Sequence, residues 1–153
     1  MANNEGLTSS WKILQIGMVV KDMGQAVESL SAFGFGPFDT KELPPGGKLV
    51  SKSQPGRARV DLLRTMLGDI ELELCQPVSG QSTHQEYLDS KGEGIHHVLF
   101  EVQDLNAELD RFTKHGAKVL LHITFDGGGL AYVDLNTCGF IVELVQLPPE
   151  YPD

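Results

Sequence analysis

The sequence predicts an α+β fold built from two similar halves, each a strand followed by a helix and further strands. The segment that begins at Gln15 can be laid without a gap on the segment that begins at His97, 82 positions later (97 − 15). A second match brings Glu73-Leu-Cys-Gln onto Glu143-Leu-Val-Gln, with a spacing of 70 (143 − 73). Because a repeat at a fixed spacing marks a duplicated structural unit, we expect the two halves to fold alike.

Residues 13–20 predict the first strand, because their side chains alternate with the period of two that is typical of a strand with two different faces. One face would carry Leu14, Ile16, Met18 and Val20, and the other would carry Gln15, Gly17 and Val19. Trp11 is expected to be a packing residue just before this strand.

A helix is expected after the first strand of each half. Asp22 is a suitable N-cap, apolar residues then recur at helical spacing, and Gly34 is placed to end the helix. The second half repeats this pattern with Asp104 as the cap and Gly116 at the end. The apolar stripes predict that one face of each helix is core.

The rest of each half predicts strands separated by turns. The expected strands are 48–52, 58–66 and 69–76 in the first half, and 118–125, 130–135 and 139–146 in the second. Between the halves, residues 78–94 form a connector in which Ser82 to Leu88 is expected to be a short helix. Gly127-Gly128-Gly129 is either a hairpin turn or a lid that closes over a ligand.

Four polar side chains fall on the face that is not expected to be core. In the last strand of each half, Leu and Val on both sides of Glu73 and Glu143 would face the helix, so both carboxylates point the other way. The same alternation puts Gln15 and His97 on that second face. If the half-sheets pair into one curved surface, these side chains meet inside its concavity.

An amide, an imidazole and two carboxylates together predict a site for one divalent metal. Two carboxylates crowded in a partly dry cleft repel each other unless a cation compensates. The donor set suits Zn, Co, Ni, Mn or Fe(II) and leaves the metal's identity open. Alone, each residue has an ordinary explanation, such as a solvated strand Glu or a hydrogen-bonded His. Their matching positions in both repeats favour a shared site.

Composition and charge limit the classes of binding partner that we expect. The chain has 153 residues, 41% of them hydrophobic, which fits one globular domain. Its formal net charge of −9 argues against nucleic acid or an anionic membrane as a partner, because like charges repel. No apolar run approaches the roughly 18 residues that a membrane-spanning helix needs, and no signal-peptide core is seen at the N-terminus. Cys75 and Cys138 are expected to be buried, reduced thiols of a cytoplasmic protein.

Half of the twelve basic residues lie between positions 41 and 64: Lys41, Lys48, Lys52, Arg57, Arg59 and Arg64. They indicate either an edge that attracts a phosphate or carboxylate, with Arg57 and Arg59 as substrate-binding candidates, or a solvated loop and strand edge. Structural or surface roles are expected for His84, His115 and His122. His96, opposite His97 by alternation, is expected to pack on the helix side or to bond the backbone.

Three segments resemble a known family: Gly92-Glu-Gly-Ile-His-His-Val, Glu71-Leu-Glu-Leu-Cys-Gln-Pro and Val19-Val-Lys-Asp-Met. Across nearly its whole length the chain resembles the vicinal oxygen chelate superfamily of glyoxalase-type proteins, and it looks most like methylmalonyl-CoA epimerases and their glyoxalase-like relatives. The resemblance implies one domain over residues 1–153, with two βαβββ modules in tandem (11–78 and 95–148, joined by a connector at 79–94) whose curved mixed sheet surrounds one metal. Dimers are usual in this superfamily, so a homodimer is expected.

The resemblance also implies proton transfer at a carbon next to a carbonyl. The set Gln15, Glu73, His97 and Glu143 is similar to the metal set of zinc-type glyoxalase I, a lyase, whereas the sequence segments favour an epimerase, an isomerase. Glyoxalase I has an arginine at the position of Val19. The second acid or base of the epimerases aligns near Arg57, with Glu101 as a substitute candidate. Both reactions therefore stay open.

In either reaction, Glu143 would remove the proton and Glu73 would return one. The substrate would be a small acyl-CoA, or a glutathione thioester or hemithioacetal. A non-catalytic protein that sequesters drugs or other small molecules is the main alternative. A ring-cleaving dioxygenase ranks last, because its iron site requires His at position 15.

Overall fold

The computed structural model describes residues 8–40, 48–49 and 58–149. In this part of the chain the elements are β1 (Lys12–Val19), α1 (Met23–Ala32), β2 (Lys48–Leu49), β3 (Arg59–Leu67), β4 (Ile70–Ser79), α2 (Thr83–Lys91), β5 (Gly94–Glu101), α3 (Leu105–Lys114), β6 (Lys118–Phe125), β7 (Gly128–Asp134) and β8 (Ile141–Gln146). No helix among these is long and apolar enough to cross a membrane.

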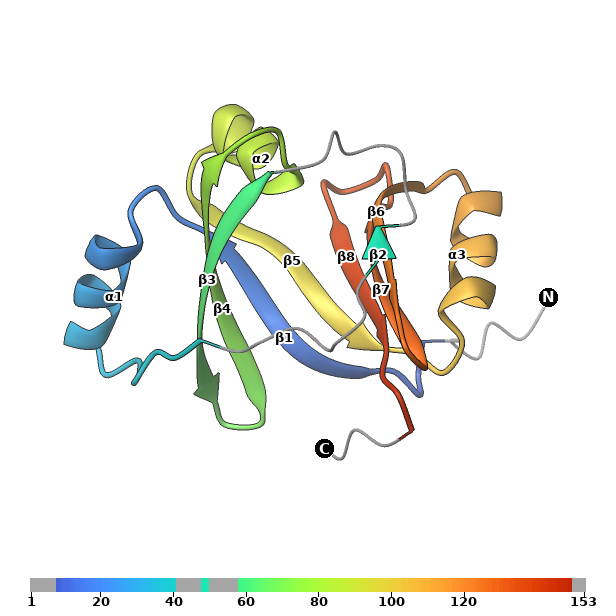
Figure 1. The fold of residues 1–153 in the computed structure, drawn as a ribbon, viewed down its shortest axis with the longest axis horizontal. Coiled ribbons are helices and arrows are strands. Elements are labelled where there is room, and N and C mark those ends of the chain that lie inside the picture. The colour runs from blue at the N-terminus through green and yellow to red at the C-terminus, as the bar shows by residue number, and fades with distance from the viewer. Residues whose placement is uncertain (1–7, 41–47, 50–57, 150–153) are drawn as a thin grey trace.

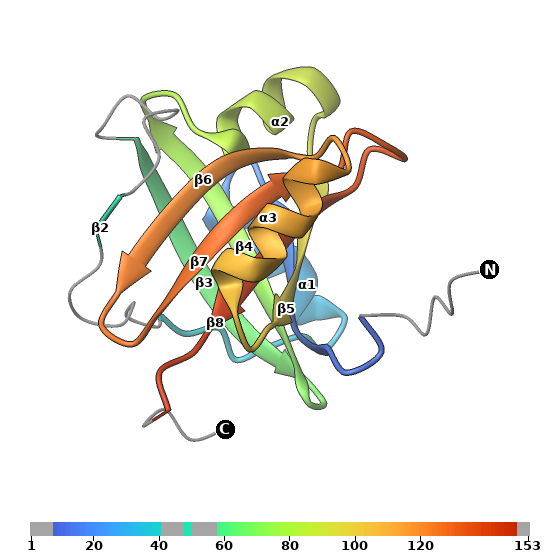
Figure 2. The ribbon, with the colours of Figure 1, turned by 90° about the vertical axis from the view of Figure 1, so that its right-hand side faces the viewer.

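All eight strands form one mixed sheet in the order β2-β6-β7-β8-β5-β1-β4-β3. The sheet is curled: β3 and β4 form one arm, β6, β7 and β8 form the other, and β1 and β5 run between them (Figure 1). Helix α1 lies outside the first arm, and α3 lies across the outer side of the second arm (Figure 2). The predicted α+β fold with a curved mixed sheet is confirmed.

The two helices begin and end in the same way. The Asp22 side chain accepts a hydrogen bond from the Gln25 backbone N–H at 2.9 Å, and Asp104 accepts one from Ala107 at 3.0 Å, so both predicted N-caps are confirmed. Gly34 (φ 93°) and Gly116 (φ 88°) follow the two helix ends. This left-handed conformation favours glycine, which explains why the repeat keeps glycine at both positions.

A glutamine from the last strand of each half also caps the helix of that half. Gln76 Oε1 accepts the Met23 N–H at 2.6 Å, and Gln146 Oε1 accepts the Leu105 N–H at 3.0 Å. These donors belong to the first helical turn, where backbone N–H groups have no partner within the helix. The glutamine shared by the two matched segments therefore ties each helix to its sheet.

In the described ranges, three apolar clusters build the core. On the helix side, Leu72 and Leu74 pack with α1, and Val142 and Leu144 pack with α3, so the predicted facing of both last strands is confirmed. The third cluster lies on the inner face of the sheet and consists of Phe125, Leu130 and Val145, with Leu14, Leu99, Ile123 and Leu147 packed against them.

Two bulges interrupt the pairing of β1 with β5, which runs Ile13–Phe100, Gln15–Leu99, Gly17–His97 and Met18–Ile95. Leu14 is the extra residue of β1, and His96 is the extra residue of β5. They are 82 positions apart (96 − 14), so the bulge is part of the repeat. Because a bulge breaks strict alternation, Leu14 does not share a face with Met18 as predicted, but packs in the inner cluster.

Turns account for the other differences from the predicted strands. The β3–β4 hairpin turns at Gly68 and Asp69, one residue later than predicted. Gly128 lies in β7, where an added Cβ would come 2.0 Å from the Gln146 carbonyl oxygen. The three-glycine segment is thus part of a hairpin and not a lid. Cys75 is buried as predicted, but Cys138 is exposed in the turn before β8, so that prediction was wrong.

Candidate active site

Four side chains from β1, β4, β5 and β8 meet on the inner face of the sheet. His97 Nε2 lies 3.2 Å from Gln15 Oε1, 3.1 Å from Glu143 Oε2 and 3.8 Å from Glu73 Oε1. All four residues are buried. Ligands that lie about 2.0–2.2 Å from a common ion are separated by roughly 3–3.6 Å at tetrahedral or octahedral angles. The distances from His97 Nε2 to Gln15 and Glu143 fall in this range and the distance to Glu73 is slightly longer, so a small inward shift of Glu73 would suit a divalent cation held beside His97.

The amide of Gln15 is turned with its oxygen toward His97. Its Nε2 donates to Glu71 Oε1 at 2.7 Å and to Glu73 Oε2 at 3.1 Å. Only the oxygen of an amide can bind a cation, because the NH₂ group is a donor. Glu71 and Glu73 therefore hold Gln15 in the orientation that a metal ligand needs.

The imidazole of His97 lies directly over Gly17 of β1. A Cβ built on Gly17 would come 2.0 Å from Cε1 and 2.3 Å from Nε2 of this ring. Any other residue at position 17 would displace the ring. Gly17 is thus part of the site, although it has no side chain to contribute.

Glu73 lies beside a cation. Arg64 Nε lies 2.8 Å from Glu73 Oε2 and 3.1 Å from Glu71 Oε1, and the Arg64 side chain is only 11% exposed. Burial, followed by the nearby charge of Glu143, raises the pKa of Glu73 above 4.5, while Arg64 acts in the opposite direction. Arg64 was expected at a basic surface edge, and the structure instead places it in the site.

Glu143 has a different neighbour. Its cross-strand partner on β7 is Tyr132, which is buried and whose ring centroid lies 5.0 Å from that of His97. Burial, with the Glu143 charge as the next cause, raises the pKa of Tyr132 well above 10, so this phenol stays neutral. Arg64 and Tyr132 therefore occupy equivalent places beside the two glutamates.

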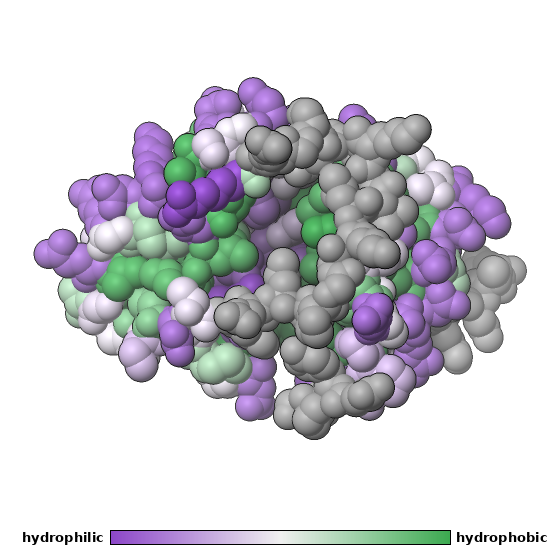
Figure 3. All heavy atoms as spheres, in the orientation of Figure 1, coloured by the Kyte–Doolittle hydropathy of each residue, from purple (hydrophilic) through white to green (hydrophobic). Residues whose placement is uncertain are grey.

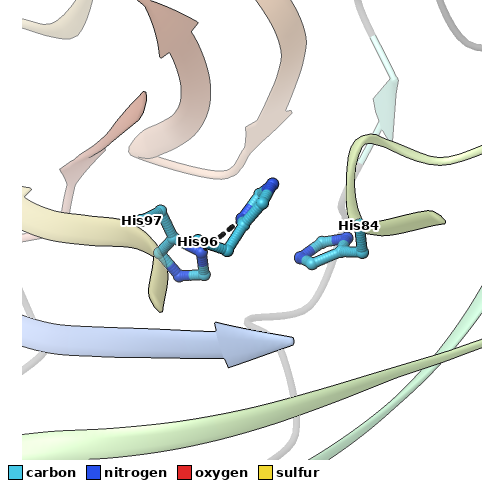
Figure 4. Close-up of side chains that lie close together, drawn as sticks. All are labelled: His84, His96 and His97. Carbon is cyan, nitrogen blue, oxygen red and sulfur yellow. Dashed lines mark hydrogen bonds between the residues drawn. The ribbon is translucent and has the colours of Figure 1, made fainter. Parts of the chain in front are cut away.

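Two further histidines lie on one side of His97, with His96 next to it and His84 beyond (Figure 4). His96 Nδ1 lies 2.9 Å from His97 Nδ1, and the ring of His84, from α2, stacks on that of His96 with centroids 4.6 Å apart. Burial lowers the pKa of His84 to about 3 and that of His96 to about 2, with neighbouring histidines adding to both shifts. His84 is thus a buried residue and not a surface group.

The three histidines offer ring nitrogens within 4.8 Å of one another, but they are poorly arranged to chelate an ion. The planes of His84 and His96 differ by only 30°, so in-plane lone pairs of these stacked rings run side by side and do not converge. Nε2 of each of these two rings is buried and has no hydrogen-bond partner among the described residues. The convergent donors are those around Nε2 of His97.

The remaining candidates lie apart from these donors. Arg59 is at the start of β3, where its exposed guanidinium contacts Asp61 at 3.1 Å, and Arg57 lies outside the described residues. Glu101 ends β5 and lines a separate hollow of about 500 Å³ together with Lys12. The space between the two arms has hydrophilic residues at its floor and hydrophobic residues along the β3–β4 arm (Figure 3).

The chain belongs to the Glyoxalase/Bleomycin resistance protein/Dioxygenase superfamily, whose sequence profile matches residues 14–133. The predicted family is therefore confirmed. Among curated proteins, the uncharacterized protein YqjC of Bacillus subtilis (strain 168) is 28% identical over 100 residues. That match covers 58% of this chain and 66% of the relative, just under two thirds of its length.

Solved structures share the fold. A hypothetical protein from Bacillus halodurans C-125 has a TM-score of 0.65 at 18% identity, over 94% of this chain and 99% of that one. A variant of methylmalonyl-CoA epimerase from Streptomyces coelicolor, in complex with 2-nitronate-propionyl-CoA, has a TM-score of 0.59 at 26% identity, over 88% of this chain and 96% of that one.

Proposed function

We propose that this protein is a metal-dependent enzyme that transfers a proton at the carbon next to a carbonyl group of a small acyl thioester. The observation that carries the proposal is the convergence of Gln15, Glu73 and Glu143 on Nε2 of His97 within 3.1–3.8 Å. The similarity to an epimerase that binds 2-nitronate-propionyl-CoA supports an acyl-CoA substrate and an isomerase reaction. Gln15 in the donor set supports the lyase reaction on a glutathione hemithioacetal as the second candidate.

Zn, Co, Ni or Mn would be held by Gln15, Glu73, His97 and Glu143. When bound, such an ion supplies a positive charge that stabilises the negative charge developing on the carbonyl oxygen of the substrate. The buried position of the four donors supports this role, because electrostatic stabilisation is larger where water is excluded.

The surroundings of the two glutamates support different tasks for them. Glu73 Oε2 is held by Arg64 and Gln15, and the pKa of Glu73 is raised by burial, which favours a carboxyl group that carries and returns a proton. Glu143 has a neutral cross-strand partner, Tyr132. We assign removal of the substrate proton to Glu143 and its return to Glu73.

Solvent hydrogen exchange tests the reaction. Zinc- or cobalt-loaded protein is mixed in D₂O with methylmalonyl-CoA, or with the hemithioacetal of methylglyoxal and glutathione, and deuterium at the alpha carbon is followed by NMR. We expect metal-dependent exchange with one of the two, at least about a hundredfold slower in Glu143→Gln and unchanged in Glu101→Gln. Absence of metal-dependent exchange with both substrates would defeat the proposal.

One contact favours the alternative, a metal-free protein that binds or sequesters a small molecule. Arg64 already gives Glu71 and Glu73 a positive partner, so part of their charge is compensated without an ion. Metal content measured after purification without chelators separates the two proposals. About one divalent ion per chain supports the enzyme, and its absence supports the binding protein. Substrate binding by Arg57 and Arg59, a cytoplasmic location and a homodimer stay predictions.

A further inference from the structure

We propose that His96 is a positioning residue, which accepts the Nδ1–H of His97 and so holds His97 in the tautomer whose Nε2 can bind the metal. The inference rests on the proposed function. The Nδ1 atoms of the two rings lie 2.9 Å apart, and a dashed line marks this contact in Figure 4.

The β5 bulge makes this contact possible. Consecutive residues of a regular strand point to opposite faces, so neighbouring histidines would normally be separated by the sheet. His96 is the extra residue between the Gly17–His97 and Met18–Ile95 pairs. A bulge re-aims a side chain, and here it brings the ring of His96 against that of His97.

The contact fixes a choice between two tautomers. A neutral imidazole has one N–H and one lone pair, so a pair of facing Nδ1 atoms holds one hydrogen between them. If His96 donates it, the N–H of His97 is on Nε2 and points toward Gln15 Oε1 and Glu143 Oε2. If His97 donates it, the lone pair on Nε2 faces those same oxygens, and an ion can bind there. Histidine ligands commonly donate their second N–H to a carboxylate, a backbone carbonyl or water, and here a histidine nitrogen takes the place of that acceptor.

Neighbours from α2 fix the plane of the His96 ring. His84 stacks on one face at 4.6 Å with an interplanar angle of 30°, and Tyr87 meets the ring edge-on at 5.2 Å. His96 is 3% exposed, so water does not take its place as the acceptor of the Nδ1–H of His97. The buried ring is thus held with its Nδ1 facing that of His97, and the backbone of Thr83 is a further hydrogen-bonding neighbour of this ring.

The other half shows that the fold itself does not require histidine here. Leu14 occupies the equivalent bulge in β1 and packs in the inner apolar cluster. A leucine is therefore compatible with this backbone conformation. A leucine side chain cannot accept a hydrogen bond. His96→Leu therefore removes the hydrogen-bond acceptor at position 96 while keeping a side chain that the equivalent bulge tolerates.

The test compares metal affinity in two variants of the full chain, measured by calorimetric titration with Zn²⁺. We expect His96→Leu to weaken binding about 10–100-fold, whereas His96→Asn, whose side-chain oxygen reaches about the place of Nδ1, stays within about threefold of the unchanged protein. The matched control is His122→Leu. His122 also has a buried Nε2 for which the described part of the chain offers no hydrogen-bond partner, but His122 pairs with Ala131 on the helix side of the sheet, so we expect unchanged affinity.

Nitrogen NMR of the unchanged protein reads the tautomer directly and does not depend on whether a variant folds. With zinc bound, the hydrogen of His97 should be on Nδ1. Binding of zinc by His96→Leu as tightly as by the unchanged protein overturns the inference and leaves the proposed function standing. A hydrogen on Nε2 of His97 with zinc bound means that this nitrogen is not a ligand, which overturns the inference and the proposed metal set together. If the unchanged protein binds no Zn²⁺, Co²⁺, Ni²⁺ or Mn²⁺, the proposed function fails instead, and this inference falls with it. Loss of binding in His84→Phe but not in Glu143→Gln places the ion on the histidine trio and overturns both.

Discussion

Glu73 and Glu143 occupy equivalent positions in the two halves of the sheet, but Arg64 lies across from the first and Tyr132 across from the second. The same contrast continues around them. Glu71 and Arg64 form a charged network on the first half, and neutral histidines and a neutral phenol surround the second. Duplication has kept the backbone and the helix caps, while the side chains that set charge have diverged.

The difference between Arg64 and Tyr132 shows how one repeated unit can supply two carboxylates with distinct surroundings. Two carboxylates in different surroundings can take different roles in one reaction. Two identical halves would give two identical glutamates. The asymmetry between Arg64 and Tyr132 is therefore as important to the proposed chemistry as the symmetry of the donors.

The largest expected effect is at Gly17, whose equivalent in the second half is Leu99. In Gly17→Ala the new methyl group would occupy the place of the His97 ring, so we expect metal affinity to fall by about a thousandfold, or roughly 4 kcal/mol. Leu99→Ala is the control: it should lower stability by about 2–3 kcal/mol through lost packing and leave affinity nearly unchanged. Zinc titration of both variants checks the contrast, and tight binding by Gly17→Ala would contradict it.

Removing Arg64 tests the first half. Arg64→Met leaves the buried Glu73 and the half-buried Glu71 without this cation, so the free energy of unfolding should fall by about 3 kcal/mol in the presence of a chelator. Added zinc should restore part of the loss. Tyr132→Phe, at the equivalent place, should cost less than about 1.5 kcal/mol. Urea unfolding measures both values, and equal losses would mean that the two halves are not asymmetric in charge.

Acid should affect the two halves in opposite directions. The lowered pKa values of His84 and His96, about 3 and about 2, mean that the unfolded chain takes up protons first as the pH falls below 6.5. Their contribution to stability is present above that pH and is lost on acidification, by about 2 kcal/mol for each residue at pH 5. Glu73 has a raised pKa, so its contribution is present below pH 4.5 and is lost as the pH rises through the folded value.

Urea unfolding at pH 7.5 and pH 5, with a chelator present, measures the histidine effect. The double variant His84→Phe/His96→Leu should lose most of the difference in stability between the two pH values. An unchanged difference in this variant would show that other groups cause the acid sensitivity.

The smallest expected effects should be equal in the two halves. Gln76→Ala and Gln146→Ala each remove one side-chain acceptor from a helix N-terminus, and each should lower stability by about 1 kcal/mol. Thermal unfolding of the two variants compares them. A difference of several kcal/mol would show that the two helix caps are not equivalent after all.

Local patterns in the sequence were sufficient for the repeated framework. The N-caps Asp22 and Asp104, the glycines after each helix and the facing of Leu72 and Leu74 follow from capping chemistry and from periods of two and 3.6 residues. These signals depend on neighbours within a few positions, so they can be recognised without knowledge of tertiary contacts. The roles of the four donors remain predictions, although their convergence is a feature of the structure.

The surroundings of those donors could not be predicted, for three physical reasons. Alternation cannot detect an inserted residue, so the bulges at Leu14 and His96 were missed. The predicted β3–β4 turn was one residue too early, and such a shift changes every cross-strand pair of the hairpin. The pairing of Arg64 with Glu73 was therefore not predicted. A two-residue turn that begins at Gly68 would have predicted it. The contact of His84 with His96 joins α2 to β5 through tertiary packing, which no local pattern encodes.

The most direct test of the proposed metal site is a crystal structure of zinc-loaded protein with anomalous scattering data collected at the zinc edge. We expect one anomalous peak about 2.0–2.1 Å from Nε2 of His97 and within bonding distance of oxygens from Gln15, Glu73 and Glu143. A peak on the histidine trio, or no peak at saturating zinc, would contradict it.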